Sequence, residues 1–289
     1  MGIEDRFRLC GRVMKVLCAL VCGLASVAAG AAQSPGFTKA MQEYQQGNYN
    51  AAFADLKQLA EQGEPEAQFA LAGMYNLGKG APKDDAQATA WIHKAADGGL
   101  PEAEVNVGQM YEKGDGVPVD DVQADNWYRK AAEQGNASAQ AVLGVRYQRG
   151  QGVPQDFVQA VAWQRKAADQ GNALAQVEVG IAYQKGQGVP LDYPKAMGWY
   201  RKAIAQSDMN SVFLLATMYA QGQGIKKDYV GAYALLSFAA ASPGPNQGSV
   251  VSVRDSLMKV MSMGQIDKGK YVASQMQKVG VLQALDTPH

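Results

Sequence analysis

Residues suited to acid–base, thiol or metal chemistry are few in this chain, and their spacing does not suit catalysis. Histidine occurs twice among 289 residues: His93 lies two positions after Trp91 in a predicted helix, and His289 is the last residue. Two histidines placed in this way cannot complete a metal site or a catalytic triad. The neighbouring carboxylates Asp84 and Asp85 point apart at a helix start, where aspartate is favoured as a cap. We therefore predict a protein that is not an enzyme and that has no metal or other cofactor.

The first 32 residues have the pattern of a secretory signal peptide. Four basic residues precede an apolar run from Val16 to Ala29, and small residues follow at Ala31 and Ala32. The run is shorter than the roughly 20 residues that a spanning helix needs. We therefore expect cleavage after Ala31 or Ala32 and no membrane span in the mature protein. Met14 is an alternative start to Met1, because Met14 also opens a good signal.

Removal of this segment changes the chemistry open to the protein. All the cysteines lie within it: Cys10, Cys18 and Cys22. The mature chain then has neither disulfides nor catalytic thiols, and its stability depends on packing. Its formal charge becomes −2. We expect a mildly acidic protein of the bacterial periplasm or exterior.

Composition indicates a folded protein that does not act on nucleic acid. The hydrophobic fraction of 47% is high enough for a core, and the charged fraction is only 19%. Formal net charge is zero for the full chain. Binding to phosphate backbones needs a clear excess of lysine and arginine on one face. Nucleic acid is therefore excluded as the main partner.

Aromatic residues and glycines recur with a period of 36 residues. The tyrosines of this series define five copies, numbered in chain order: Tyr75, Tyr111, Tyr147, Tyr183 and Tyr219. The tryptophans keep the same period in copies one to four: Trp91, Trp127, Trp163 and Trp199. A Gly-x-Gly pair follows each tyrosine, but it lacks the longer form that a dinucleotide-binding loop requires. Self-similarity at this period predicts an array of stacked units, with the aromatics packed between them.

Each copy is expected to contain two helices. The first ends at Gly-x-Gly, where glycine permits a left-handed cap, and a proline follows in copies one to four. The second begins after an aspartate that can cap its free amides: Asp120, Asp156 or Asp192. A small residue lies three positions before each tyrosine, which allows close approach of the helices: Ala72, Gly108, Gly144, Gly180 and Ala216. The fold class is therefore all-α.

These residues together resemble Sel1-like repeats, which are relatives of the tetratricopeptide repeat. The pattern A-x-x-x-L-G-x-x-Y-x-x-G-x-G-V-P-x-D-x-x-x-A-x-x-W-x-x-K-A-A-x-x-G runs from Glu66 to Ala241. Copy five departs from it, with Leu235 in place of tryptophan and Lys226 in place of proline. The resemblance implies an α/α solenoid that forms a right-handed superhelix. We expect one cooperative array rather than separable domains.

Segments on either side of the repeats are expected to cap the array. Residues 33–65 resemble a tetratricopeptide unit, and residues 66–241 form the repeats. A loop is predicted from Ser242 to Gly248, and two further helices complete residues 242–289. These would cover the apolar face of copy five, because a repeat array needs capped ends.

The resemblance also implies a function and a set of contact positions. Such arrays act as protein–protein interaction scaffolds, with a partner peptide or protein held on a concave face lined by the first helices. The contact positions lie two before, one after and two after each repeat tyrosine. They are Gln109, Glu112, Lys113, Val145, Gln148, Arg149, Ile181, Gln184 and Lys185. Three of these are cations in one register, which favours an acidic group or a C-terminal carboxylate on the partner.

Two alternatives stay open at this stage. The contact positions also fit a plain solvated helix face. Recognition of peptidoglycan or polysaccharide is a second candidate function, and it would favour exposed aromatic rings in the groove. The repeat aromatics are instead expected in the packing.

Overall fold

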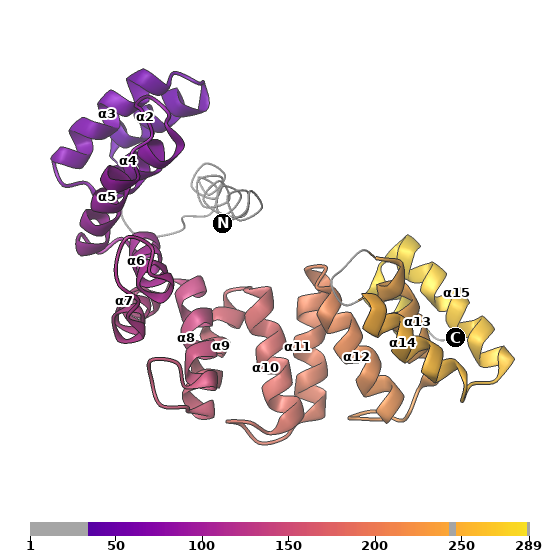
Figure 1. The fold of residues 1–289 in the computed structure, drawn as a ribbon. Coiled ribbons are helices and arrows are strands. Elements are labelled where there is room, and N and C mark those ends of the chain that lie inside the picture. The colour runs from indigo at the N-terminus through magenta and orange to yellow at the C-terminus, as the bar shows by residue number, and fades with distance from the viewer. Residues whose placement is uncertain (1–33, 243–246, 288–289) are drawn as a thin grey trace. The chain divides into compact units, whose positions relative to one another are not determined.

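The computed structural model describes residues 34–242 and 247–287 (Figure 1). The predicted signal peptide, its three cysteines and His289 lie outside these residues. Within them, every regular element is a helix, and the helices follow one another as antiparallel pairs. The all-α prediction is confirmed for the described part of the chain. Contacts divide the chain into two compact units, residues 1–136 and 137–289, which are described separately below.

The first unit contains six described helices. They are α2 (Pro35–Gln45), α3 (Tyr49–Glu61), α4 (Pro65–Leu77), α5 (Asp85–Asp97), α6 (Pro101–Lys113) and α7 (Asp121–Glu133). Helices α2 and α3 precede copy one, and α4–α5 and α6–α7 are copies one and two. Apolar residues of α2 and α3, such as Phe37 and Leu56, form one buried cluster with Leu71 and Met74 of α4. The helix pair before copy one therefore shares the core of the first repeat.

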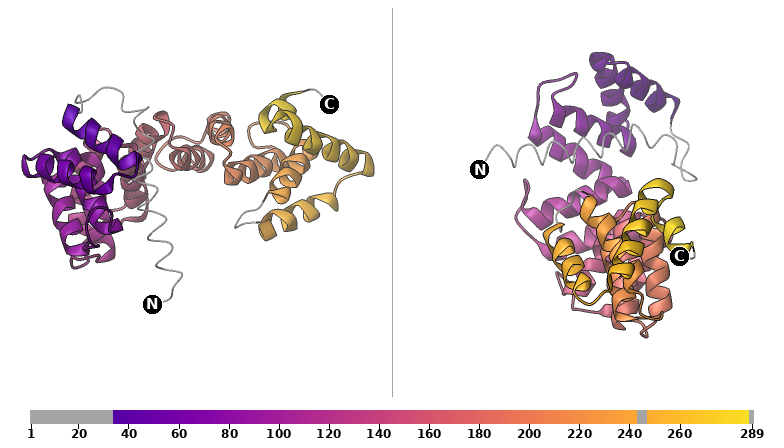
Figure 2. Two further views of the ribbon diagram at one scale, coloured as in Figure 1. Left: turned by 90° about the horizontal axis from the view of Figure 1, so that it is seen from above. Right: turned by 90° about the vertical axis from the view of Figure 1, so that its right-hand side faces the viewer.

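The second unit contains the other three copies and the C-terminal helices. The repeats are α8 (Ala137–Arg149) with α9 (Phe157–Asp169), α10 (Ala173–Lys185) with α11 (Tyr193–Ala205), and α12 (Met209–Gln221) with α13 (Tyr229–Ala241). After them come α14 (Gln247–Met258), α15 (Met263–Val279) and α16 (Val281–Asp286). Helices α14 and α15 both pack against α13 (Figure 2).

Helix ends lie where the capping residues predict them. The Asp120 carboxylate accepts hydrogen bonds from the amides of Val122 and Gln123, at 3.0 Å each, and so satisfies donors of the first turn of α7. Asp156 and Asp192 cap α9 and α11 in the same way. First helices end at a left-handed glycine, for example Gly114 with φ of 75°. These confirmed caps fix the length of each helix and so the spacing of the repeats.

Aromatic side chains fill the cores, as the sequence predicts. Trp91, Trp163 and Trp199 are only 8–9% exposed. Leu235, which replaces tryptophan in copy five, is fully buried. The next residue, after each tryptophan or after Leu235, is also buried in copies two to five, which the sequence pattern did not predict. Tyr128 and Tyr200 have no exposed surface at this position.

This second aromatic explains the small residues of the first helices. The Tyr128 ring lies across Gly108, where a Cβ atom would approach its Cε1 atom to 2.8 Å. The Tyr200 ring crosses Gly180 with a corresponding approach of 2.5 Å. Alanine replaces glycine only where the facing residue is aliphatic, in the pairs Ala72–Ile92 and Ala216–Leu236. The size of the second-helix residue therefore decides between glycine and alanine on the first helix.

A row of buried polar side chains also follows the repeat. The residue three positions after the start of each first helix is Gln68, Glu104, Gln140 or Gln176 in copies one to four, and each is less than 9% exposed. Glutamines at the ends of second helices donate to three of them: Gln134 to Glu104, Gln170 to Gln140, and Gln206 to Gln176, at 2.8–3.0 Å. Burial raises the pKa of Glu104, opposed by the charge of Lys130.

The C-terminal segment differs from the sequence prediction in two respects. Helix α14 begins at Gln247, at the end of the expected loop, of which residues 243–246 lie outside the described residues. The Gln247 side-chain amide donates to the Ala240 carbonyl at the end of α13. Helix α16 was not predicted. It begins after Gly280, whose φ of 94° permits a sharp turn from α15. Asp286 of α16 pairs with Arg201, so this short helix returns to α11.

Candidate functional site

The nine predicted contact residues lie on the first helices of copies two, three and four. Three are on α6 in the first unit: Gln109, Glu112 and Lys113. The other six are on α8 and α10 in the second unit: Val145, Gln148, Arg149, Ile181, Gln184 and Lys185. Within the second unit, the two sets occupy equivalent turns of successive first helices. The three positions relative to the repeat tyrosine, two before it, one after it and two after it, differ in what their side chains do.

The residues one position after the tyrosine take part in hydrogen bonds within the protein. The Tyr128 hydroxyl donates to Glu112 Oε2 at 2.9 Å, and the Tyr200 hydroxyl donates to Gln184 Oε1 at 2.7 Å. Burial raises the pKa of Tyr200, so this hydroxyl remains a neutral donor. Glu112 and Gln184 therefore help to hold the buried tyrosines.

Two further hydrogen bonds of these residues connect successive copies in the second unit. Gln148 Nε2 donates to Glu178 Oε2 at 3.3 Å, which joins α8 directly to α10. Gln184 Nε2 donates to Gln223 Oε1 at 2.7 Å, which joins α10 to the turn after α12. The first helices of neighbouring copies therefore lie side by side along this face, as an interaction surface requires.

The residues two positions before the tyrosine are partly used in packing. Gln109 is exposed, whereas Val145 and Ile181 are half-buried. Ile181 packs against the buried cluster that contains Val179 and Tyr183. This register therefore offers apolar surface in the second unit and a polar side chain in the first.

The residues two positions after the tyrosine are exposed cations. Lys113, Arg149 and Lys185 lie in the last turns of α6, α8 and α10. None of them forms an ion pair with any residue that the structure describes. Their position at a helix C-terminus is favoured by the helix dipole. It also leaves a full positive charge available to another molecule.

Cations stacked on the repeat tryptophans were missed by the sequence analysis. Each lysine of the K-A-A segments places its Nζ atom 3.7–3.8 Å from the centroid of the tryptophan three positions earlier. The pairs are Lys94–Trp91, Lys130–Trp127, Lys166–Trp163 and Lys202–Trp199. The W-x-x-K spacing on a helix is the signal that identifies them. One face of each indole is thus covered by a lysine of its own helix, which argues against tryptophans that stack on a ligand.

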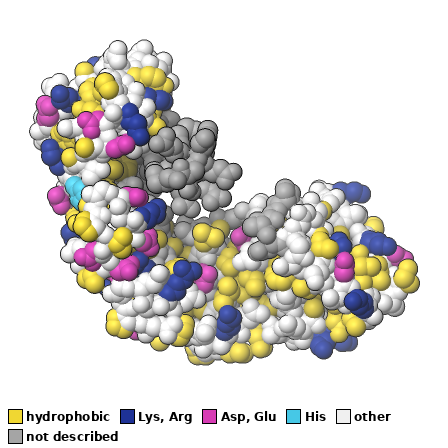
Figure 3. All heavy atoms as spheres, in the orientation of Figure 1, with side chains coloured by type: hydrophobic (Ala, Val, Ile, Leu, Met, Phe, Trp, Pro, Cys, Tyr) yellow, Lys and Arg dark blue, Asp and Glu magenta, His cyan; other side chains and the backbone are white. Residues whose placement is uncertain are grey.

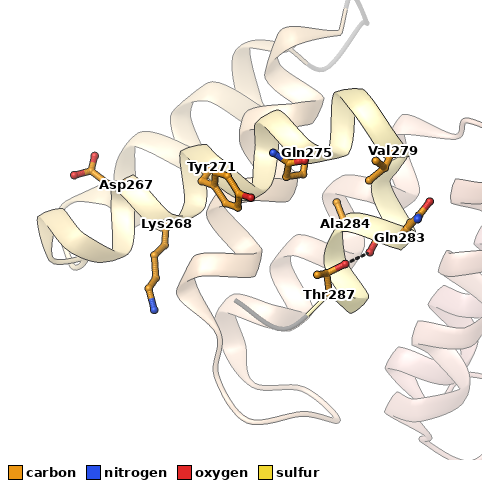
Figure 4. Close-up of a pocket in the computed structure, with 8 residues that line it drawn as sticks. All are labelled: Asp267, Lys268, Tyr271, Gln275, Val279, Gln283, Ala284 and Thr287. Carbon is orange, nitrogen blue, oxygen red and sulfur yellow. Dashed lines mark hydrogen bonds between the residues drawn. The ribbon is translucent and has the colours of Figure 1, made fainter.

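A pocket of the second unit lies outside the repeats (Figure 4). It has a volume of about 540 Å³, within the range of small-molecule sites. Tyr271, Gln275 and Val279 follow one another at four-residue spacing on α15, and Gln283 of α16 and Thr287 just after it also line the pocket. The Tyr271 side chain is 60% exposed. The pocket depends on the turn at Gly280 into α16, for which the sequence contains no predictive pattern.

Residues 34–242 and 247–287 hold no group of three or more histidine, cysteine or acidic side chains placed to bind a metal ion. Over the same residues, no helix combines the length and the apolar character that crossing a membrane needs. On the described surface visible in Figure 3, basic and acidic side chains are interspersed.

The helix pairs and their first-helix face define the class of the protein as an α/α solenoid of tandem repeats. The Sel1 repeat model matches residues 65–100, 101–136, 137–172, 173–208 and 210–242. These matches cover more than half of the chain, and the chain belongs to the Sel1 repeat family. Sel1 repeat proteins generally mediate protein–protein interactions, and their fold is known as a non-catalytic scaffold.

Solved structures agree with this assignment. A Sel1 repeat protein from Oxalobacter formigenes is 29% identical, with a TM-score of 0.71 over 82% of this chain and 98% of its own. A protective antigen present in uropathogenic Escherichia coli strains, which displays the same repeat fold, is 25% identical. Its TM-score is 0.54, over 86% of this chain and 62% of its own. A comparison with curated proteins gave no match.

Proposed function

We propose that this protein is an interaction scaffold of the bacterial envelope that holds an acidic segment of a partner protein on its first helices. The observation that supports this most directly is that an exposed cation lies at the same position of each of these first helices. The cations are Arg149 and Lys185 in the second unit and Lys113 in the first. Each is a positive charge without an ion-pair partner among the described residues. Arginine and lysine in this arrangement suit the carboxylates of an acidic peptide or of a C-terminus.

Neighbouring residues supply the rest of a contact surface. Val145 and Ile181 are half-buried, so apolar atoms lie beside the cations on the same helices. Gln148 and Gln184 are held by hydrogen bonds, which reduces the conformational entropy that binding would otherwise cost. A charged rim beside a small apolar area is typical of a specific but modest interface.

Charge reversal tests the proposal. Arg149→Glu combined with Lys185→Glu is expected to leave the melting temperature nearly unchanged, because both side chains are exposed. Capture of the partner from an envelope extract should fall strongly, since two attractions become repulsions. Binding of the partner so identified is then measured by calorimetry with the purified proteins.

A control variant makes the same change in charge elsewhere. Arg165 and Lys259 are exposed cations of the second unit that lie off the first helices. Their reversal to glutamate should keep partner binding within about twofold. Full binding by the Arg149 and Lys185 variant, with loss in this control, would show that another face binds the partner.

We place the protein in the periplasm or outside the cell on the basis of its N-terminal sequence. The apolar segment from Val16 to Ala29 and the small residues that follow support export. Fractionation of cells that express the full chain tests this placement. Recovery of the protein in the cytoplasm at full length would contradict it.

Glycan recognition is a second candidate function, favoured by the C-terminal pocket. An exposed tyrosine ring beside two side-chain amides can stack on a sugar ring and bond its hydroxyls, and Tyr271, Gln275 and Gln283 provide these groups. Titration with soluble peptidoglycan fragments tests it. Binding that Tyr271→Ala abolishes would support this function, and the absence of binding would reject it.

A further inference from the structure

Copy three differs from its neighbours at one core position. Gln164 follows the tryptophan there, where copies two and four have Tyr128 and Tyr200. Gln164 is 4% exposed, and its Nε2 atom donates to the Ala141 carbonyl oxygen at 3.1 Å. Its Oε1 atom accepts no hydrogen bond from any described residue. A buried acceptor without a donor is costly, so this oxygen favours a ligand that can donate.

A narrow cavity opens beside Gln164, where α8, α9 and α10 meet. Its polar lining comes from Gln148, Gln164, Glu178 and Gln187, and Phe157 contributes an aromatic ring. No lysine or arginine is among the described side chains that line it. The cavity is therefore rich in acceptors and has no cation of its own.

Glu178 gives the cavity a negative charge. Its carboxylate is half-buried and accepts a hydrogen bond from Gln148, but it forms no ion pair within the described residues. A carboxylate, an unsatisfied amide oxygen and an aromatic ring together form an environment that attracts a cation. The ligand is thus expected to be positively charged and to donate hydrogen bonds.

The size of the cavity selects the kind of cation. Its volume is about 20 Å³, close to the volume that a single water molecule needs. A primary ammonium is compact, whereas a guanidinium is planar and broader. Ala160, Val161 and Ala182 form an apolar wall that suits the methylene groups behind a lysine ammonium.

We propose that this cavity binds the side-chain ammonium of a lysine from the partner protein. The inference rests on the proposed function, because Gln148 belongs to the same first-helix face. Arg149 is the next residue along α8, so one partner segment with a lysine close to an acidic residue would satisfy both charges. The cavity then adds specificity that a row of surface cations does not have.

A small probe tests the cavity without the partner. The mature protein, labelled with ¹⁵N, is titrated with Nα-acetyl-lysine amide, and backbone amide resonances are followed by NMR. Saturable shifts are expected around Gln164 and Ala182. The Nε-acetylated derivative, which has no charge, and the matching arginine derivative should bind at least tenfold more weakly.

Two variants should remove this binding by different routes. Glu178→Gln takes away the negative charge of the cavity and is expected to weaken binding of the lysine probe at least tenfold. Gln164→Tyr fills the cavity with the side chain that copies two and four have, where Gly144 leaves room for the ring and Gln148 can accept its hydroxyl. It should abolish binding and keep the melting temperature. Asp169→Asn removes an exposed carboxylate of α9 and should change the affinity less than twofold.

Three results would overturn the proposal. In the first, Glu178→Gln or Gln164→Tyr binds the lysine probe as tightly as the unaltered protein does. In the second, the neutral or the arginine derivative binds as tightly as the lysine probe. In the third, the unaltered protein shows no saturable binding of the lysine probe. None of these results affects the charge-reversal experiment on Arg149 and Lys185, in which capture of the partner is measured. Failure of the cavity and failure of the proposed function are therefore distinguishable.

Discussion

The contact between Gly180 and Tyr200 predicts the effect of a single added methyl group. Gly180→Ala would place a Cβ atom 2.5 Å from Cε1 and 2.7 Å from Cδ1 of the Tyr200 ring. The ring has no exposed surface, and its hydroxyl donates to Gln184. It therefore cannot move aside without disturbing both the core and this hydrogen bond.

The expected cost follows from two opposed effects. Overpacking of this kind costs roughly 1–3 kcal/mol. Alanine gains up to about 1 kcal/mol over glycine in a helix interior. We expect the free energy of unfolding to fall by about 1–2 kcal/mol.

Gly198 provides the matched control for this substitution. It lies inside α11 of the same unit, is exposed, and has no heavy atom within 4 Å of an added Cβ. Gly198→Ala should therefore show the helix preference alone and raise the free energy of unfolding by about 0.5–1 kcal/mol. The two substitutions are chemically identical and should have opposite signs.

A rescue variant tests the cause. Copy five combines Ala216 with Leu236, so Gly180→Ala should be tolerated better beside Tyr200→Leu. Tyr200→Leu alone is expected to cost about 2 kcal/mol, from lost burial and the lost hydrogen bond to Gln184. The double variant should be less destabilised than the sum of the single variants, by about 1–2 kcal/mol.

Urea unfolding followed by tryptophan fluorescence gives the free energy of unfolding of the four variants and of the unaltered protein. Additive single effects, within about 0.5 kcal/mol, would show that the two side chains do not interact. Stabilisation by Gly180→Ala similar to that by Gly198→Ala would refute the packing assignment altogether.

Three further predictions concern the core, the buried carboxylate and the N-terminus. Trp163→Ala should lower the free energy of unfolding by about 3–5 kcal/mol, because it truncates a buried aromatic side chain. Trp163→Leu should lower it by clearly less, since leucine occupies this position in copy five. Equal losses of stability for the two variants in denaturant titrations would argue against a packing role for Trp163. Burial raises the pKa of Glu104 above its usual 4.5, so this residue's contribution to stability is greatest below that pH and is lost as pH rises through the raised value. Glu104→Gln should therefore increase the melting temperature at pH 7 and have little effect at pH 4, and a pH-independent change would contradict this explanation. The exported protein should begin at Ala32 or Gln33 and melt identically with and without reductant, and N-terminal sequencing that finds Cys18 or Cys22 would disprove this.

Sequence alone predicts the parts of this fold that depend on local rules. Asp120 caps α7 and Gly114 ends α6 through interactions within a few residues, so spacing was sufficient to locate them. The burial of Trp163 follows from its period. Helix α16 has no such local signal: it is six residues long, and its pairing of Asp286 with Arg201 joins positions far apart in the chain.

The candidate site shows the same division. Exposure of Arg149 and Lys185 follows from their place in the last turns of α8 and α10, next to the Gly-x-Gly turn that ends each first helix. The hydrogen bonds of Glu112 and Gln184 depend instead on tyrosines of the following helix, which the sequence analysis had not placed in the core. The cavity beside Gln164 likewise requires three helices to be in position before it can be recognised.

The lysine stacked on each tryptophan has a consequence for how such a protein can change in length. Lys166 and Trp163 lie three residues apart on one helix, so the shielding of that indole is contained within its own copy. A duplicated copy brings its own shield, and a deleted copy takes its shield away. Gain or loss of a whole unit therefore leaves the lysine-covered face of every remaining indole covered, whichever copy is its neighbour.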